Sequence, residues 1–206
     1  MDAITSVPVP VNEPVHSYAP GTAERATIAE ALRARAAQVD DIAPMIGGEL
    51  SADGPVLEVR MPSDHSTLLA RVHQATTQHA TAAIGAAMKA KAEWAALPFD
   101  ERAAVFLRAA DMLAGPQRDV INAATMLGQG KTVQQAEIDA ACELIDFLRF
   151  NVAFASELYS HQPISSPGVW NRMDYRPLDG FVFAITPFNF TAVSYTHLTL
   201  PTNREV

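Results

Sequence analysis

The stretch GFVFAITPFN, residues 180–189, decides the fold class. A glycine precedes a short, continuous apolar run, and that run ends just before Pro187. Such a run is typical of a fully buried strand in a parallel sheet. We therefore predict an α/β fold in which 180–186 is the first strand of a βαβ unit. Ligands are expected where this strand ends.

Asn189 comes directly after the predicted strand, at a strand-to-helix turn. Its side-chain amide could donate a hydrogen bond to an oxyanion that develops during a reaction, which is a large effect when the donor is preorganised. The alternative is that Asn189 caps a helix starting at Phe190. Its position alone favours the cap and leaves both roles open.

Three kinds of segment precede this strand. Residues 1–25 are rich in proline and predict an extended arm. Short strand patterns at 42–50 and 55–62 flank Asp53-Gly54, which suits a hairpin turn, so a small antiparallel appendage is expected. The rest is helical in pattern, with predicted helices at 26–39, 76–97, 101–114, 117–128 and 132–160.

Composition restricts the class of protein. The formal net charge is −8 over 206 residues and no basic cluster occurs, which argues against a nucleic-acid partner. The single cysteine, Cys142, excludes an internal disulfide and a cysteine-based zinc site, and no metal is expected. Neither a signal peptide nor a bilayer-spanning apolar run is evident, so we expect a cytoplasmic protein without a membrane partner.

Glu137 is the most informative residue of the long helical pattern. A projection at about 100° per residue places Glu137 and Asn151 inside an apolar stripe. That stripe contains Val133, Ala136, Ala140, Leu144, Phe147, Phe154 and Leu158. A carboxylate on such a face must be functional or paired, because burying it without a partner is costly. A structural partner, such as an arginine or a backbone group, is favoured, and a functional role stays open.

Two further features have simpler interpretations. The same projection places Cys142 opposite Glu137, in mid-helix, with nothing nearby to lower the pKa of its thiol; we interpret it as a packing residue. The segment GQGKT, residues 128–132, lacks the spacing of a phosphate-binding loop, because Thr125 stands where a glycine is required. It is interpreted as a turn between two helices.

Two longer segments resemble a known family. They are MLGQGKTVQQAEIDAACELIDFLRFNVAFA (126–155) and YRPLDGFVFAITPFNFTA (175–192). Both are similar to the L-glutamate gamma-semialdehyde dehydrogenases, also called delta-1-pyrroline-5-carboxylate dehydrogenases, within the aldehyde dehydrogenase superfamily. The segment WAALPFDERAAVFLRAADMLAG (94–115) resembles the superfamily as a whole. The resemblance runs from about residue 10 to Val193.

This resemblance implies NAD-dependent oxidation of L-glutamate gamma-semialdehyde to L-glutamate, the second step of proline degradation. The family uses a cysteine thiolate, a general-base glutamate and a Rossmann-like cofactor domain. By position, Asn189 matches the asparagine that stabilises the oxyanion, and Glu137 matches an acid beside the substrate. Four residues match the strand end that lines the nicotinamide and ribose of the cofactor: Ile185, Thr186, Pro187 and Phe188.

The resemblance stops at Ser194. We therefore divide the chain into an extended arm (1–25), an incomplete N-terminal part of the NAD-binding domain (26–193) and a non-family tail (194–206), which we interpret as an artefact of an interrupted reading frame. In relatives the nucleophile and the general base lie beyond this point, so the fragment is expected to be inactive alone. The intact enzyme is expected to be a homo-oligomer. The alternatives are an aldehyde dehydrogenase with another substrate, or a non-catalytic helical interaction fragment.

Overall fold

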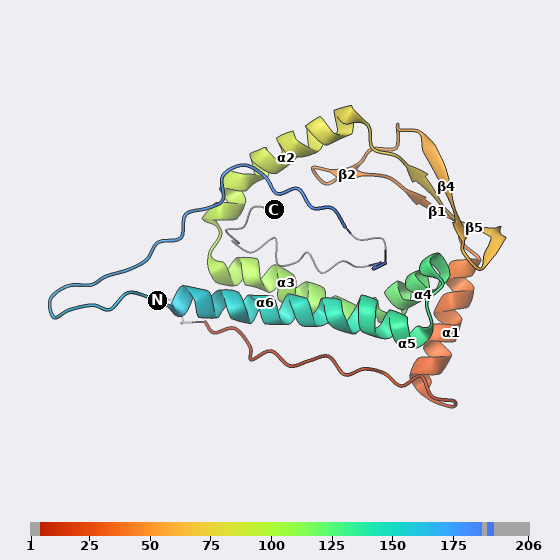
Figure 1. Ribbon diagram of the computed structural model, residues 1–206, viewed down its shortest axis with the longest axis horizontal. Helices are drawn as coiled ribbons and strands as arrows, with labels where there is room; N and C mark the ends of the chain where they lie inside the picture. The colour runs from red at the N-terminus through yellow and green to blue at the C-terminus, as the bar shows by residue number, and fades with distance from the viewer. Residues whose placement is uncertain (1–4, 187–188, 192–206) are drawn as a thin grey trace.

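The computed structural model describes residues 5–186 and 189–191, and helices make up about half of these residues (Figure 1). The helices are α1 (Ala23–Ala36), α2 (Thr77–Ala96), α3 (Phe99–Ala114), α4 (Arg118–Gln129), α5 (Val133–Ala136), the π-helix η1 (Glu137–Cys142) and α6 (Glu143–Ser160). The strands are β1 (Asp40–Ile42), β2 (Met45–Ile46), β3 (Glu49–Leu50), β4 (Val56–Met61) and β5 (Asp64–His73). Along the chain, one helix is therefore followed by the small sheets and then by the helical layer.

The strands form two small sheets, but the predicted hairpin at Asp53-Gly54 is wrong. In one sheet β5 lies between β1, which is parallel to it, and β4, which is antiparallel. In the other, β2 and β3 are joined through Gly47 and Gly48, whose φ angles of 61° and 92° suit a tight hairpin turn. Gly54 is needed for another reason: a Cβ there would collide with the carbonyl oxygen of Gln74.

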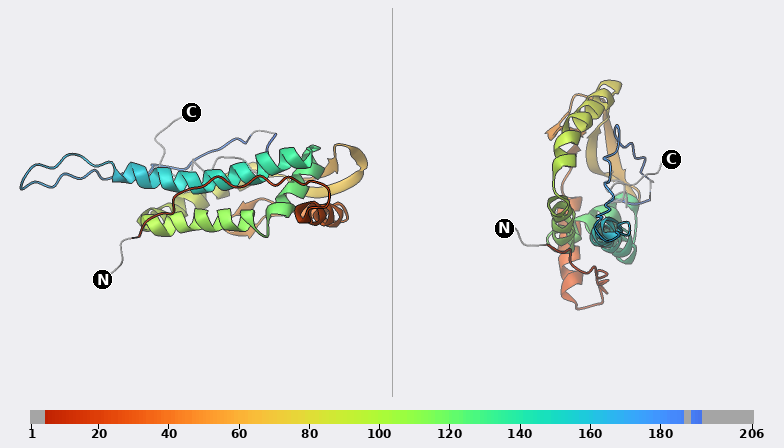
Figure 2. Two further views of the ribbon diagram at one scale, coloured as in Figure 1. Left: turned by 90° about the horizontal axis from the view of Figure 1, so that it is seen from below. Right: turned by 90° about the vertical axis from the view of Figure 1, so that its left-hand side faces the viewer.

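Helix packing forms two apolar clusters. The first lies between α3 and η1–α6, where Ala110 and Ala141 let the helices approach closely and Ile145 and Leu148 fill the contact. In Figure 2 these two helices run side by side. The second cluster joins α1 to α4 through buried apolar side chains: Tyr18, Ile28 and Ala123. The helical layer is thus a pair of packed helices with α1 and α4 at one end.

The apolar stripe predicted for the long helix is wrong beyond residue 142. Phe154 and Leu158 are 53% and 54% exposed, whereas α6 buries Ile145, Leu148, Val152 and Ala155. The cause is η1, because a π-helix bonds residue i to residue i+5 and so adds one residue to a turn. Every residue that follows is rotated relative to the α-helical projection.

The predicted strand at 180–186 does not form. The segment is irregular, and Phe183 and Ile185 are 77% and 73% exposed. None of the strands in the described part of the chain pairs with it. A parallel strand exists only through hydrogen bonds to its neighbours, so an apolar run without them remains extended and exposed.

The N-terminal arm lies along the helical layer. From residue 5 to residue 19 it contains no helix or strand, and it runs beside α6 toward α1 (Figures 1 and 2). The side chain of Asp146 on α6 holds it, accepting from the Asn12 amide and from the Glu13 backbone N–H, each at 2.7 Å. Of the described helices, none combines the length and the apolar character that a membrane span needs.

Candidate functional site

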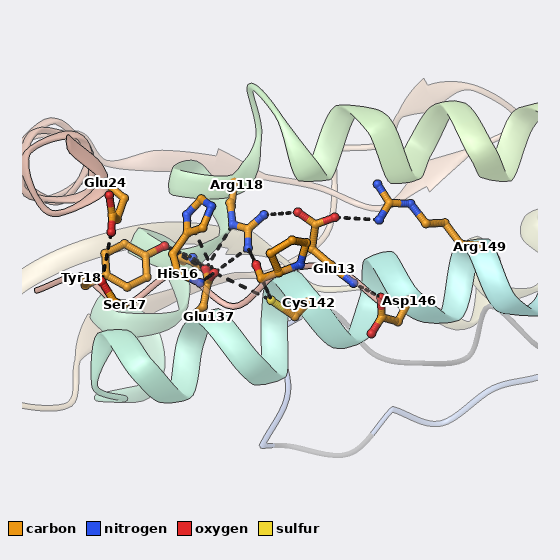
Figure 3. Close-up of polar contacts among 12 residues, drawn as sticks. Glu13, His16, Ser17, Tyr18, Glu24, Arg118, Glu137, Cys142, Asp146 and Arg149 are labelled. Carbon is orange, nitrogen blue, oxygen red and sulfur yellow. Dashed lines mark hydrogen bonds and ion pairs between the residues drawn. The ribbon is translucent and has the colours of Figure 1, made fainter. Parts of the chain in front are cut away.

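Glu137 lies at the centre of a buried polar cluster formed by the arm, α4 and η1 (Figure 3). Its Oε1 accepts hydrogen bonds from the His16 backbone N–H at 2.8 Å and from Arg118 Nη2 at 2.5 Å. Its Oε2 accepts from the Tyr18 hydroxyl and the Asn122 amide, both at 2.8 Å. The carboxylate is fully buried and both oxygens are occupied, which favours the structural alternative. Contact with a substrate stays a prediction.

Arg118 supplies the charge that balances this carboxylate. It is the first residue of α4, and its side chain is 5% exposed. Besides Glu137, its guanidinium donates to the Glu13 carboxylate and, at 2.7 Å, to the carbonyl oxygen of Pro14. The other carboxylate oxygen of Glu13 accepts from Arg149 Nη1 at 2.6 Å. Two carboxylates thus face two guanidiniums, and the arm is fastened to the helices through them.

The hydrogen bonds set the ionisation states of the cluster. Burial alone would raise the pKa of Glu137, but bonds from Arg118 and the His16 backbone, with those of two further side chains, lower this pKa to about 2. Burial and the adjacent carboxylate raise the pKa of Tyr18. Burial opposes the charge on Arg118, yet its bonds to the carboxylates raise its pKa. Glu137 is therefore ionised and Tyr18 is neutral at ordinary pH.

Tyr18 connects the arm to the cluster at some local cost. Its φ angle of 51° lies in the left-handed region, which is unfavourable for a bulky residue. The ring is 3% exposed, and its hydroxyl accepts from Asn122 Nδ2 at 3.1 Å while donating to Glu137. The hydrogen bonds and the burial of the ring offset the strain. The sharp change of chain direction before α1 follows from this conformation.

Cys142 belongs to the same cluster, so its predicted place opposite Glu137 is wrong. Its Sγ lies 3.7 Å from Glu137 Oε1 and 3.4 Å from Arg118 Nη2. The i to i+5 spacing of the π-helix brings the two residues to one side. Burial, with the nearby carboxylate, raises the pKa of the thiol to about 12. The thiol is protonated at neutral pH, in agreement with the interpretation of Cys142 as a packing residue.

The ionised Glu137 should make the chain sensitive to acid. Because its folded-state pKa of about 2 lies below the ordinary 4.5, its contribution is complete above pH 4.5 and is lost as pH falls toward 2. The contribution is on the order of 3 kcal/mol. Urea unfolding of wild type and E137Q at several pH values measures it: the difference in free energy of unfolding should shrink as pH falls from 4.5 to 2. A difference independent of pH would contradict the assignment.

Asn189 lies in an exposed turn that contacts α4 and the loop directly after it. Its backbone carbonyl oxygen accepts from Lys131 Nζ, and Lys131 also donates to Asp139 Oδ2 at 2.7 Å. Two residues on, the Thr191 hydroxyl is bonded to the Thr125 hydroxyl at 2.7 Å. Within residues 5–186 and 189–191 the side-chain amide of Asn189 makes no hydrogen bond. Its role as oxyanion donor or helix cap stays a prediction.

The other predicted cofactor residues are only partly described. Ile185 and Thr186 are exposed and stand just before the turn. Pro187 and Phe188 lie outside the described residues. The cluster around Glu137 and the turn at Asn189 are joined by η1, because Asp139, two residues from Glu137, forms the ion pair with Lys131. The cluster around Glu137 and the turn at Asn189 are thus connected through residues of the same π-helix.

A separate groove of about 410 Å³ opens between α2, α3 and the segment 175–182. Aromatic side chains line it, among them Trp94 and Tyr159, and Lys91 and Arg102 add positive charge. None of the predicted site residues borders it. Within the described residues no cluster of His, Cys, Asp or Glu could hold a metal ion.

Several residues that build these two regions were not singled out from the sequence. An arginine is only one example of the structural partners expected for Glu137, and the sequence pattern does not single out Arg118. Lys131 belongs to the GQGKT segment, which was interpreted as a turn, and the structure confirms a turn there: Gly130 ends α4 in a left-handed conformation. Nothing local indicated that the lysine of this turn reaches residue 189.

Residues 50–202 match the aldehyde dehydrogenase family. The match covers more than half of the chain, so the chain belongs to this family. It also extends into 194–202, beyond the point at which the resemblance was expected to stop. The helices and small sheets correspond to the N-terminal part of the fold seen in delta-1-pyrroline-5-carboxylate dehydrogenase structures.

Relatives within the family carry a narrower name. The chain is 48% identical over 190 residues to the probable delta-1-pyrroline-5-carboxylate dehydrogenase of Schizosaccharomyces pombe, covering 91% of this chain and 35% of that protein. The crystal structure of the Mycobacterium tuberculosis enzyme bound with NAD is 62% identical, with a TM-score of 0.90 over 93% of this chain and 36% of that one. The Thermus enzyme with bound NAD is 27% identical, with a TM-score of 0.70 over 80% of this chain and 32% of that one. The chain thus spans about a third of the length of the relatives that it matches.

Proposed function

We propose that this chain is part of an NAD-dependent dehydrogenase that oxidises L-glutamate gamma-semialdehyde to L-glutamate in proline degradation. The observation that carries the proposal is the similarity to the Mycobacterium tuberculosis enzyme, at 62% identity over 93% of this chain. The match is not confined to the helical layer that many aldehyde dehydrogenases share. At 93% coverage it must include at least part of the arm, whose Glu13 and Tyr18 build the buried cluster.

The contribution of this chain to the chemistry is the turn at Asn189. When the thiolate of the intact enzyme attacks the aldehyde carbon, the carbonyl oxygen gains negative charge. An amide N–H that already points at this oxygen stabilises the charge without reorganisation. Asn189 is suited to this role because its side-chain amide is uncommitted within residues 5–186 and 189–191. Cys142 is unsuited as the nucleophile, because burial keeps its thiol protonated.

The described residues fit only one end of NAD. When bound, NAD takes up the hydride that leaves the substrate carbon. Exposed Ile185 and Thr186 offer an apolar side chain and a hydroxyl to a nicotinamide ribose. The chain has no G-x-G-x-x-G turn, the usual seat of a dinucleotide pyrophosphate. The chain covers 36% of the NAD-bound Mycobacterium tuberculosis structure, which supports placing the remainder of the cofactor site in the other two thirds of the intact enzyme.

A chimeric dehydrogenase tests the proposal: residues 10–193 of this chain replace the matching segment of the Mycobacterium tuberculosis enzyme. NADH formation with delta-1-pyrroline-5-carboxylate should proceed with a kcat within about tenfold of the parent, since the chemistry is set by a few positioned groups. The 206-residue chain alone, assayed beside it, should form no NADH. A chimera that folds and binds NAD but does not turn over would contradict the proposal. A preference for a simple aliphatic aldehyde would favour the other-substrate alternative.

We also propose an assembly state and a location for the intact enzyme. The irregular segment after α6 projects beyond the helices (Figure 1) and exposes Ile164 and Trp170 at 92% and 80%. Such side chains are suited to a contact between copies of the intact enzyme, which supports a homo-oligomer. The proposed location is cytoplasmic; some relatives, such as that of Dictyostelium discoideum, are named mitochondrial.

A further inference from the structure

Lys131 occupies an unusual place for a lysine in a turn. Its side chain is 16% exposed, and its ammonium group has three described partners. These are Asp139 Oδ2 at 2.7 Å, the carbonyl oxygen of Asn189, and the ring of Phe190, whose centroid lies 4.9 Å away. Two of the three N–H donors of the ammonium thus have oxygen acceptors, and the ring adds a cation–π contact. Asp139, which belongs to η1, balances the charge of Lys131.

Two residues of α4 hold the same turn beside Lys131. With its amide oriented to satisfy both neighbours, Gln129 donates to the Asn189 carbonyl oxygen and accepts from the Thr191 N–H, each at 3.2 Å. Thr125, which is fully buried, is bonded to the Thr191 hydroxyl at 2.7 Å. The end of α4 and the loop after it therefore hold both Asn189, the predicted oxyanion donor, and Thr191, two positions on.

We propose that Lys131 is a positioning residue for Asn189: its ammonium fixes the peptide plane of residue 189 so that the side-chain amide is aimed before the oxyanion forms. This inference rests on the proposed function. A donor that is misplaced by about 1 Å can lose about 100-fold in rate. A fixed carbonyl on the same residue limits that movement.

The GQGKT segment gains a function through this contact. It does not cradle a phosphate, because its spacing is wrong and its lysine is already engaged by Asp139 and Asn189. Its glycine at 130 adopts a φ of 66°, which ends α4 and turns the next residue toward residue 189. A long cationic side chain is required at 131 by reach and charge, rather than by the needs of the turn itself.

The test is a double-mutant cycle in the chimeric dehydrogenase with K131M and N189A. K131M should lower kcat by about 10- to 100-fold while KM and NAD affinity stay within about twofold. In the N189A background, K131M should have no further effect on kcat, because nothing remains for Lys131 to position. Hydrogen exchange at the Thr191 amide should become faster in K131M, a readout that does not depend on turnover.

Two companion variants keep the test decisive. K131R retains the charge and several donors, and should restore kcat to within about threefold of the parent. Q129A removes the uncharged contacts to Asn189 and Thr191 and should lower kcat by about threefold, again only when Asn189 is present. This variant replaces K131M in the test if K131M does not fold. The matched control is K91M. Lys91 lies on α2 and is paired with Asp179, 3.9 Å away, which belongs to the irregular segment before Asn189. K91M should leave kcat unchanged.

The outcomes separate the inference from the proposed function. If N189A lowers kcat but K131M does not, or if K131M lowers kcat equally with and without Asn189, the positioning role is wrong while the donor role survives. If N189A leaves kcat unchanged, the donor role fails and the positioning role fails with it. A K131M variant with raised KM and normal kcat would also overturn the inference.

Discussion

Replacing Arg118 with methionine should lower the free energy of unfolding of this chain by about 3–5 kcal/mol, the usual loss when one partner of a buried ion pair is removed. Methionine fills much of the same space, so the loss is mainly of charge and hydrogen bonds. The carboxylates that face Arg118 belong to Glu13 and Glu137, whose side chains are 9% and 0% exposed. Without Arg118, the hydrogen-bond donors that Glu137 retains among the described residues are uncharged, and Arg149 is the one cationic partner of Glu13 that remains within residues 5–186 and 189–191.

Urea unfolding followed by circular dichroism measures this loss. The matched control is R108M on α3, since Arg108 is exposed and its loss should change the free energy by no more than about 0.5 kcal/mol. E137Q should cost less than R118M, because Arg118 still faces Glu13 when Glu137 becomes neutral. If R118M and R108M had equal stabilities, the cluster would contribute nothing to the fold. If E137Q cost more than R118M, the charge balance described above would be wrong.

Glu137 illustrates what a sequence pattern can predict about a buried charge. A carboxylate on an apolar helix face must have a partner, and the structure provides an arginine. The pattern could not say which one, because Arg118 reaches Glu137 across the turn at Gly130 and Tyr18 arrives from the arm, 119 residues away in the chain. Periodicity describes one helix at a time. Contacts between separate segments are set by packing, which no single helix encodes.

The π-helix shows a second limit. A projection at a constant angle per residue assumes that the helix is regular, and η1 breaks that assumption between Glu137 and Cys142. One added residue moved Cys142 from the far side of the helix into the cluster and turned Phe154 outward. No residue type marks a π-turn, so only the loss of consistent periodicity after residue 142 could have indicated it.

The positions of proline and glycine, by contrast, predicted most helix ends well. Proline ahead of α3 and glycine after α3 and α4 act within a few residues, and the observed helices end within a few residues of the predicted places. The predicted strand at 180–186 failed for the opposite reason. Its composition suits a buried strand, but its hydrogen-bond partners are absent from the strands of the described residues.

The largest expected effect on catalysis is that of Asn189. In the chimeric dehydrogenase, N189A should lower kcat by about 100- to 1,000-fold, the usual loss when one oxyanion donor is removed. KM should change little, because the missing hydrogen bond forms chiefly in the transition state. Steady-state NADH formation gives kcat and KM, and NAD titration checks that cofactor affinity is retained. A kcat within threefold of the parent would contradict the donor role.

The variant N189D separates the two roles predicted for Asn189. Aspartate is as good a helix cap as asparagine, because its carboxylate also accepts from backbone N–H groups. It cannot donate a hydrogen bond when ionised, and it would place a negative charge beside the developing oxyanion. If Asn189 only caps a helix, N189D should retain nearly full kcat and N189A should be the more damaged variant. If Asn189 is the oxyanion donor, N189D should be at least as slow as N189A although its thermal stability matches the parent.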